Sequence, residues 1–213
     1  MPVYTTDALI LRTYKLGESD RIVVFLTRDR GKKRGVAKNA RQSRRRFGGA
    51  LEPMTCGRVS YLERERRDLV SLNYVEQVRS PLSASDGEAL GYVGYFAELI
   101  DEWAQEADPN ETLFRLGASI VEALAAGVPI EPLARYFEYW LLRLQGVYEP
   151  DAGLTIEAQA FLASARTSSP FGLADIAVSR SVLRELEGRH RELISMHLEK
   201  DLKSARVLRE MRR

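Results

Sequence analysis

The chain has 213 residues, of which 45% are hydrophobic and 29% charged, with a formal net charge of +2. This balance is typical of a folded globular protein, and the length allows one large domain or two small ones. No run approaches the roughly 20 apolar residues that span a bilayer, and the first residues do not resemble a secretory signal. A single cysteine, Cys56, excludes an internal disulfide. We therefore expect a cytoplasmic protein.

Charge is distributed unevenly along the chain. Residues 1–80 hold 18 Lys/Arg against 9 Asp/Glu, residues 81–165 hold 3 against 14, and residues 166–213 hold 11 against 7. The switch in net charge from +9 to −11 falls at Ser80-Pro81, where the proline ends a strand or precedes a helix. We therefore expect a domain boundary here, giving domains 1–80 and 81–213.

The first domain is predicted to be β-structure. Five short segments rich in Leu, Ile, Val, Thr and aromatic residues are separated by turn residues. They cover residues 4–15, 21–28, 33–38, 53–63 and 69–78, and a charged turn at 64–68 joins the last two. In the second segment, Ile22, Val24 and Leu26 occupy one face of the strand and Val23, Phe25 and Thr27 the other. Five strands without helical periodicity indicate a closed barrel of the oligonucleotide-binding (OB) type, with an SH3-like barrel as the alternative.

The second domain is predicted to be all-α. Ser85 and Glu88 resemble a capping box before a helix that carries Trp103. Asp108-Pro109-Asn110-Glu111 combines an N-cap, a proline at the first helical position and an acid in the first turn, and this helix should run to Ala126. Further helices are expected at residues 131–145, at about 155–164, and as one or two helices within about 179–210.

Few residues are available to build an active site. The sequence contains no G-x-x-x-x-G-K-[ST] phosphate loop, so ATP turnover is not expected. His190 and His197 lie on one predicted helix with no cysteine nearby, which favours surface positions over a zinc site. Cys56 has no histidine close in sequence and is expected to be a buried structural thiol. We therefore expect a binding protein and not an enzyme.

The clearest functional signal is the basic stretch at residues 28–46, which holds ten Lys/Arg and a single acid, Asp29. Cations at this density repel one another unless a polyanion lies among them, and binding to phosphates releases condensed counterions. We expect the stretch to line a groove that follows a phosphodiester backbone. The alternative is a solvated loop with only nonspecific affinity. The predicted nucleic-acid-binding residues are Arg30, Lys32, Lys33, Arg34, Lys38, Arg41, Arg44, Arg45, Arg46 and Phe47.

Aromatic rings for base stacking are a second requirement of a single-strand site. Phe47 is the first candidate, and Tyr14, Phe25 and Tyr61 are weaker ones. Each of them could instead be a structural residue; Phe25, for example, lies in a hydrophobic strand and is more often a core residue than a stacking platform. Gly48 and Gly49 then let the chain turn sharply or approach a ligand closely.

Several motifs resemble the family of the bacterial DNA repair protein RecO. They are GESDRIV at 17–23 followed by FLT at 25–27, GK at 31–32, AKNARQSR at 37–44, FGGALEP at 47–53, RDL at 67–69 and HLEKDLKS at 197–204. The resemblance implies an N-terminal OB barrel and a C-terminal helical domain. It also implies a non-enzymatic recombination mediator that binds single- and double-stranded DNA and anneals complementary strands. With RecR, such a protein helps RecA replace single-strand DNA-binding protein.

The sequence departs from the family pattern at one place, and the resemblance does not locate one of the expected partner sites. Many members of the family carry four cysteines as a zinc module after a segment like 146–150, but residues 151–172 contain none here. Zinc is therefore not expected as a cofactor, and apolar packing must hold this segment instead, through Leu154, Ile156, Phe161 and Leu162. The family also contacts the acidic C-terminal tail of single-strand DNA-binding protein through its helical domain. Arg135, Arg143 or the basic last helix is the expected site.

Two other functions remain open at this point. An RNA-binding OB protein fits the basic stretch equally well, because no residue reads a 2′-hydroxyl recognisably. A protein-interaction scaffold whose cations meet an acidic partner is the third possibility.

Overall fold

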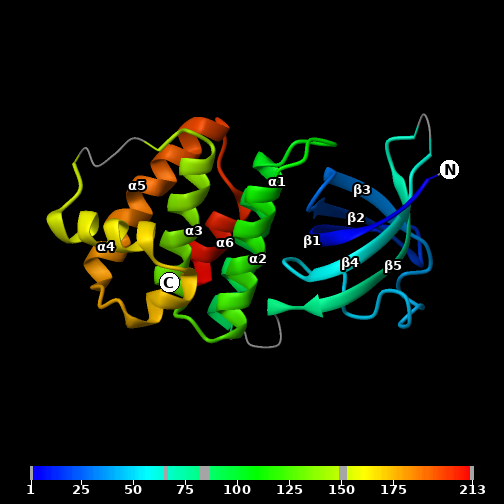
Figure 1. Cartoon of the computed structure of the whole chain (residues 1–213), viewed down its shortest axis with the longest axis horizontal. Helices are drawn as coiled ribbons and strands as arrows, with labels where there is room; N and C mark the ends of the chain where they lie inside the picture. The colour runs from blue at the N-terminus through cyan, green and yellow to red at the C-terminus, as the bar shows by residue number, and fades with distance from the viewer. Residues whose placement is uncertain (1, 65–66, 82–86, 149–152, 212–213) are drawn as a thin grey trace.

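A computed structural model describes residues 2–64, 67–81, 87–148 and 153–211 of the chain. A five-stranded barrel occupies one end of the molecule and helices occupy the other (Figure 1). The strands are β1 (Val3–Leu16), β2 (Asp20–Thr27), β3 (Gly31–Ala37), β4 (Cys56–Leu62) and β5 (Val70–Arg79). The helices are α1 (Gly87–Trp103), α2 (Glu111–Ala125), α3 (Ile130–Leu144), α4 (Ile156–Thr167), the 3₁₀ helix η2 (Pro170–Asp175), α5 (Arg180–Leu198) and α6 (Lys203–Met211). The prediction of five strands followed by helices is confirmed.

The strands close into a barrel in the order β1-β2-β3-β5-β4. All neighbouring pairs are antiparallel except β3 and β5, which run parallel over the short register Gly35↔Val70 to Ala37↔Leu72. Gly35 is required at this seam, because a Cβ on it would clash with the Leu72 side chain. The crossover from β3 to β4 is the loop that contains the second half of the basic stretch.

The alternation along β2 divides two apolar cores. Val23 and Phe25 point into the barrel, where they pack with Tyr61 and other interior side chains. Val24 and Leu26 point outward into a second core that includes most of the helical residues. The outer face of β1 and β2 therefore packs on α1 and α2, the helices nearest the barrel in Figure 1. The expected domain boundary at residue 80 falls between β5 and α1. The barrel and the helices on either side of it nevertheless share one apolar core, to which the barrel contributes Val24 and Leu26.

The start of α2 differs from the prediction. Asn110 is the N-cap, and its side-chain oxygen accepts a hydrogen bond from the Leu113 N–H at 2.9 Å. Asp108 lies upstream, with its backbone against Gly31, where no Cβ would fit. Tertiary contact with the β2–β3 turn therefore moves the helix start past Pro109. The predicted capping box at Ser85 lies outside the described residues.

The helices enclose a polar cluster that corrects two predictions. His190 is fully buried, and its Nδ1 lies 3.0 Å from Glu138 Oε2. Arg135, only 3% exposed, forms an ion pair with Glu138 Oε1 at 3.0 Å, and the Tyr95 hydroxyl donates to the same oxygen at 2.8 Å. His190 is therefore not a surface residue, and Arg135 is too deeply buried to contact a partner protein.

Helix α4 lies within residues 151–172, the cysteine-free segment for which the sequence predicts apolar packing in place of zinc. Phe161 and Leu162 are buried as predicted, and Trp140 Nε1 donates to the Ala165 carbonyl at 3.2 Å. Ile156, however, is 82% exposed and takes no part in this packing. None of the described helices is long and apolar enough to cross a membrane.

Candidate nucleic-acid interface

The first four cations of the basic stretch face other groups of the protein. Arg28 Nη2 lies 2.7 Å from Glu111 Oε1, and Lys33 Nζ lies 2.9 Å from Glu63 Oε1. The Arg30 guanidinium stacks over the Tyr4 ring, 3.8 Å from its centroid. Lys33 is largely covered, so its charge is used within the barrel.

Lys32 is the clearest case of a cation with a structural position. Its ammonium donates to the Asp101 carbonyl at 2.6 Å and to Asp101 Oδ1 at 3.1 Å, and its backbone pairs with Gln105 and Ala107. These contacts join the β2–β3 turn to the end of α1. Lys32 and Lys33 were predicted to contact nucleic acid; the structure pairs them instead with Asp101 and with the partly exposed Glu63, so both charges are less available to a ligand than those of exposed Arg34.

The loop after β3 is fixed to the barrel by its own arginines. Arg46 donates to the Lys38 carbonyl at 2.6 Å and to Ser43 Oγ at 2.9 Å, and Arg41 donates to the Glu18 carbonyl at 3.0 Å. The Val75 N–H also donates to the Arg46 carbonyl at 2.8 Å. Gly48 then adopts a φ of 46°, the sharp turn expected from its position. The loop between β3 and β4, residues 38–55, is therefore held against the barrel and is not a free chain; we call it the capping loop.

Phe47 anchors this loop inside the barrel. The ring is 1% exposed and belongs to the apolar core that also contains Phe25 and Tyr61. The prediction that Phe47 stacks on bases is wrong, because its ring is needed to fill the barrel end. Of the four aromatic candidates, Tyr14 alone is exposed, at 46%.

Four predicted cations remain available to a ligand. Arg34, Lys38, Arg44 and Arg45 are exposed, and within the described part of the chain their side chains form no ion pair and no hydrogen bond. Arg41 is also exposed and forms no ion pair there, but it donates to the Glu18 carbonyl. Arg34 lies on the outer face of β3, because Gly35 and Ala37 point inward. Arg44 and Arg45 project from the capping loop. Of the ten Lys/Arg in the basic stretch, only this smaller set has no partner among the described residues and is therefore free to contact a ligand.

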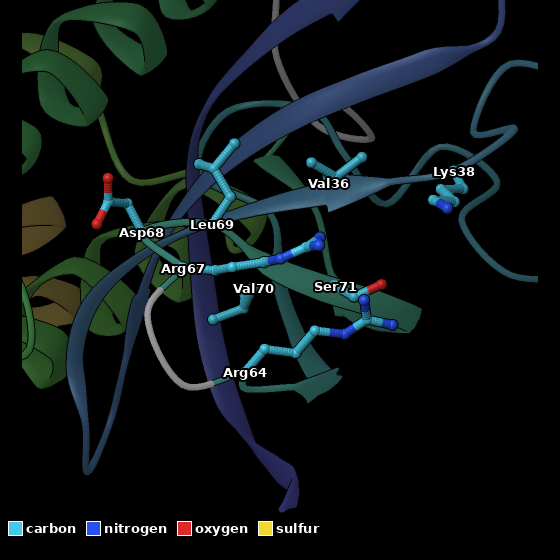
Figure 2. A pocket seen from close by; sticks show the side chains of 8 residues that line it. All are labelled: Val36, Lys38, Arg64, Arg67, Asp68, Leu69, Val70 and Ser71. Carbon is cyan, nitrogen blue, oxygen red and sulfur yellow. The ribbon is translucent and has the colours of Figure 1, made fainter. Parts of the chain in front are cut away.

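Two further arginines, Arg64 and Arg67, were missed. They flank a hollow over the parallel β3–β5 seam, which we call the β3–β5 hollow; it has a volume of about 420 Å³. Its described lining residues are Val36, Lys38, Arg64, Arg67, Asp68, Leu69, Val70 and Ser71. In Figure 2 the side chains of Arg64 and Arg67 run toward Ser71, whereas the Asp68 carboxylate points away from them. The sequence signal for these two arginines was the charged turn predicted at 64–68. Their position beside β3 follows only from the pairing of β3 with β5 in the barrel.

A second charged hollow lies in the helical part, between α3 and α4. Its volume is about 380 Å³, and its lining includes Tyr139, Arg143, Tyr148 and Arg166. Arg143 is exposed and donates to the Tyr139 hydroxyl at 2.9 Å. Arg143 therefore lies where a ligand can reach it, unlike Arg135.

Cys56 has no features of a reactive thiol. It is a free, partly buried cysteine that packs against the core shared by barrel and helices. Burial raises the pKa of its thiol to about 12, and the nearby charge of Glu122 acts in the same direction. This agrees with a structural role.

Comparisons with known proteins match the chain to two family models and to several named relatives. The family described as "Recombination protein O N terminal" matches residues 1–81, and "Recombination protein O C terminal" matches residues 84–152. A protein named "DNA repair protein RecO" from Koribacter versatilis is 44% identical over 147 residues, which cover 68% of this chain and 59% of the relative. Proteins of the same name from Anaeromyxobacter sp. (strain K) and Geobacter metallireducens are 42% and 41% identical over 141 and 142 residues. Those matches cover 55% and 57% of the relatives' length, so the chain spans little more than half of these proteins.

Proposed function

The chain belongs to the RecO family of DNA repair proteins, and we propose that it is a DNA-binding recombination mediator. It would bind single- and double-stranded DNA, anneal complementary strands and, with RecR, help RecA to load onto DNA coated by single-strand DNA-binding protein. No step in this function requires nucleotide hydrolysis.

The observation that carries the proposal is a set of exposed barrel cations that form no ion pair with the described residues. Arg34 and Lys38 come from β3 and its end, Arg44 and Arg45 from the capping loop, and Arg64 and Arg67 from the β4–β5 connection. The strand order and the parallel β3–β5 pair support an OB-type barrel, in which the loops between strands bind nucleic acid. Backbone-directed cations give affinity without sequence readout.

Annealing follows from the same electrostatics. Two complementary strands repel each other through their phosphates, and a cationic surface reduces this repulsion while it holds both strands close. Because the cations contact phosphates and do not read the bases, the Watson–Crick edges of the bases that the protein leaves uncovered stay available for pairing.

We place the tail of single-strand DNA-binding protein in the hollow between α3 and α4. Arg143 and Arg166 would neutralise the acidic residues of the tail, and the rings of Tyr139 and Tyr148 provide apolar surface beside them. Charge reversal by Arg143→Glu should abolish binding of a fluorescent tail peptide. The same reversal at exposed Arg115 on α2 is the matched control and should leave binding unchanged. Equal binding by the Arg143→Glu variant would reject this site.

We also propose that the protein works without the zinc ion of its relatives. The described residues include no group of three or more His, Cys, Asp or Glu side chains that could hold a metal ion. Helix α4 instead packs Phe161 and Leu162 into the apolar core. Elemental analysis that finds stoichiometric zinc in the purified protein would contradict this proposal.

A strand-annealing assay tests the main proposal. The protein should accelerate pairing of complementary DNA oligonucleotides, including strands coated by single-strand DNA-binding protein, and it should retain RecR in a pull-down. With about six phosphate contacts on a single strand at a slope of about −0.7 each, affinity should fall about 300-fold between roughly 50 and 200 mM salt. Failure to accelerate annealing, or much tighter binding of RNA than of DNA, would refute the mediator function.

A further inference from the structure

We propose that the β3–β5 hollow is a subsite for one unstacked nucleotide of a single strand, and that it makes the barrel distinguish single strands from duplex. This inference rests on the proposed function, because it assigns a specific task to one part of the DNA-binding surface. The exposed loop cations Arg44 and Arg45 have a different task, since they would contact the backbone of either form of DNA.

The shape and floor of the hollow suit a nucleotide. Its volume of about 420 Å³ lies within the range of about 300–1,000 Å³ found for small-molecule sites. Val36 on β3 and Leu69 before β5 are partly exposed apolar side chains that line it. A base laid against them would remove apolar surface from water, and the Ser71 side chain offers a hydroxyl beside it.

The charges of the hollow suit a phosphate. Arg64, Arg67 and Lys38 supply three cations, and Asp68 is the single acid among the lining residues that the structure describes. In the described part of the chain, no ion pair engages these three cations. Figure 2 shows both arginine side chains directed along the seam toward Ser71. Arginine forks bind phosphate oxygens in a bidentate manner, so a phosphate between them would be held in one orientation.

A duplex does not fit the same contacts. The bases of a duplex are stacked inside a stiff helix. Only its outer backbone can therefore reach a recessed site. A single strand can turn a base out of its stack and bring the adjoining phosphate down to Arg64 and Arg67. The hollow should therefore contribute to single-strand affinity and not to duplex affinity.

Two double variants that remove the same charge test this assignment. Arg64→Gln/Arg67→Gln removes the hollow's arginines, and Arg44→Gln/Arg45→Gln is the matched control on the capping loop. Affinity for an oligo(dT) strand and for a duplex of equal length is measured against salt concentration. The hollow variant should lower the salt slope for the single strand by about 1.4, from two contacts of about 0.7, and leave the duplex slope unchanged. The control should lower both slopes, by about 1.4 and about 1.8.

Cross-linking locates the base independently of affinity. An oligo(dT) that contains 5-iododeoxyuridine should cross-link to a peptide within residues 67–71. Replacing bases by abasic sites, at equal phosphate number, should weaken binding to the wild-type chain roughly five- to tenfold, as expected for lost burial of some tens of Å².

The outcomes separate the two proposals. If the wild-type chain binds neither form of DNA, the proposed function fails and the subsite falls with it. If the wild-type chain binds DNA but the hollow variant lowers both slopes equally, or neither, the mediator function stands and the nucleotide subsite is refuted. Cross-links that map only to residues 41–47 would refute it as well.

Discussion

Lys32 and Asp101 join the barrel to the first helix. The Lys32 ammonium lies 2.6 Å from the Asp101 carbonyl oxygen and 3.1 Å from its Oδ1, and Arg12 Nε lies 2.8 Å from the other carboxylate oxygen. The basic N-terminal part and the acidic helices therefore meet in the folded chain. Part of the charge that predicts a polyanionic ligand is used to hold the two halves of the protein together.

We expect Lys32→Met to lower stability and Arg34→Met to lower DNA affinity. Lys32 is largely buried, and its loss leaves the Asp101 carbonyl without this donor and the carboxylate with Arg12 alone, at a cost of about 1–3 kcal/mol. Arg34, two residues along the same strand, is exposed, so its replacement should change stability by less than about 0.5 kcal/mol. Urea unfolding and a salt titration of DNA binding measure the two effects.

The pair of variants is matched because each removes one positive charge from β3. A Lys32→Met protein of wild-type stability with a clearly reduced salt slope would show that Lys32 contacts phosphate after all. Reduced stability with an unchanged slope supports the structural position.

We expect Phe47→Ala to destabilise the barrel by about 3–5 kcal/mol, since it removes a fully buried ring. Phe47→Leu retains apolar bulk and should cost less, with DNA affinity close to that of the wild type. Chemical denaturation and oligonucleotide binding separate the two effects. A stable Phe47→Leu protein with strongly reduced affinity would instead restore the stacking role.

Much of the fold could be predicted from local patterns. Alternation along β2 placed Val23 and Phe25 opposite Val24 and Leu26, and the structure puts the two pairs into separate cores. Helix α2 ends at Ala125, one residue before the predicted end at Ala126. The N-cap of α2 was misplaced because Asp108 contacts Gly31, a tertiary contact that no local signal contains.

The site was harder to predict because charge density does not show pairing. Lys32 and Lys33 look like their neighbours in sequence, yet their partners, Asp101 and Glu63, lie 69 and 30 residues away. Arg64 and Arg67 were omitted because they reach the surface of β3 only through the parallel β3–β5 pairing. His190 was placed on the surface for the same reason, since Glu138 is 52 residues away.

Cys56 should be unreactive in the folded protein. Burial and the charge of Glu122 raise the pKa of its thiol to about 12. Because this pKa is raised from an ordinary value of 9.0, its contribution to stability is constant below about pH 9 and is lost as the pH rises toward 12. At pH 8.5, alkylation by iodoacetamide should be roughly 10²- to 10³-fold slower in the folded than in the urea-unfolded chain. Equal rates in the two states would contradict this.

Glu98 on α1 should tie the last helix to the rest of the protein in a pH-dependent way. Its carboxylate accepts hydrogen bonds from the Ser204 N–H at 2.7 Å, the Lys203 N–H at 3.3 Å and Ser204 Oγ, so it caps the start of α6. Burial alone would raise the pKa of Glu98, but the hydrogen bonds from Ser204 and Lys203 and the charge of Arg12 outweigh it and hold the pKa below its ordinary value of 4.5.

The sign of the pH effect follows from this lowered pKa. A carboxylate whose pKa is lower in the folded state stabilises the fold above pH 4.5, and the stabilisation is lost as the pH falls through the folded-state value. Glu98→Gln should therefore lower the free energy of unfolding at pH 7 by about 0.5–1 kcal/mol, because a charged cap at the N-terminus of α6 becomes neutral. The difference between variant and wild type should shrink as the pH falls from 4.5 through the lowered folded-state pKa, since the wild-type carboxylate becomes protonated over this range. Urea unfolding at a series of pH values measures this, and a difference that stays constant with pH would show that the charge of Glu98 does not hold α6.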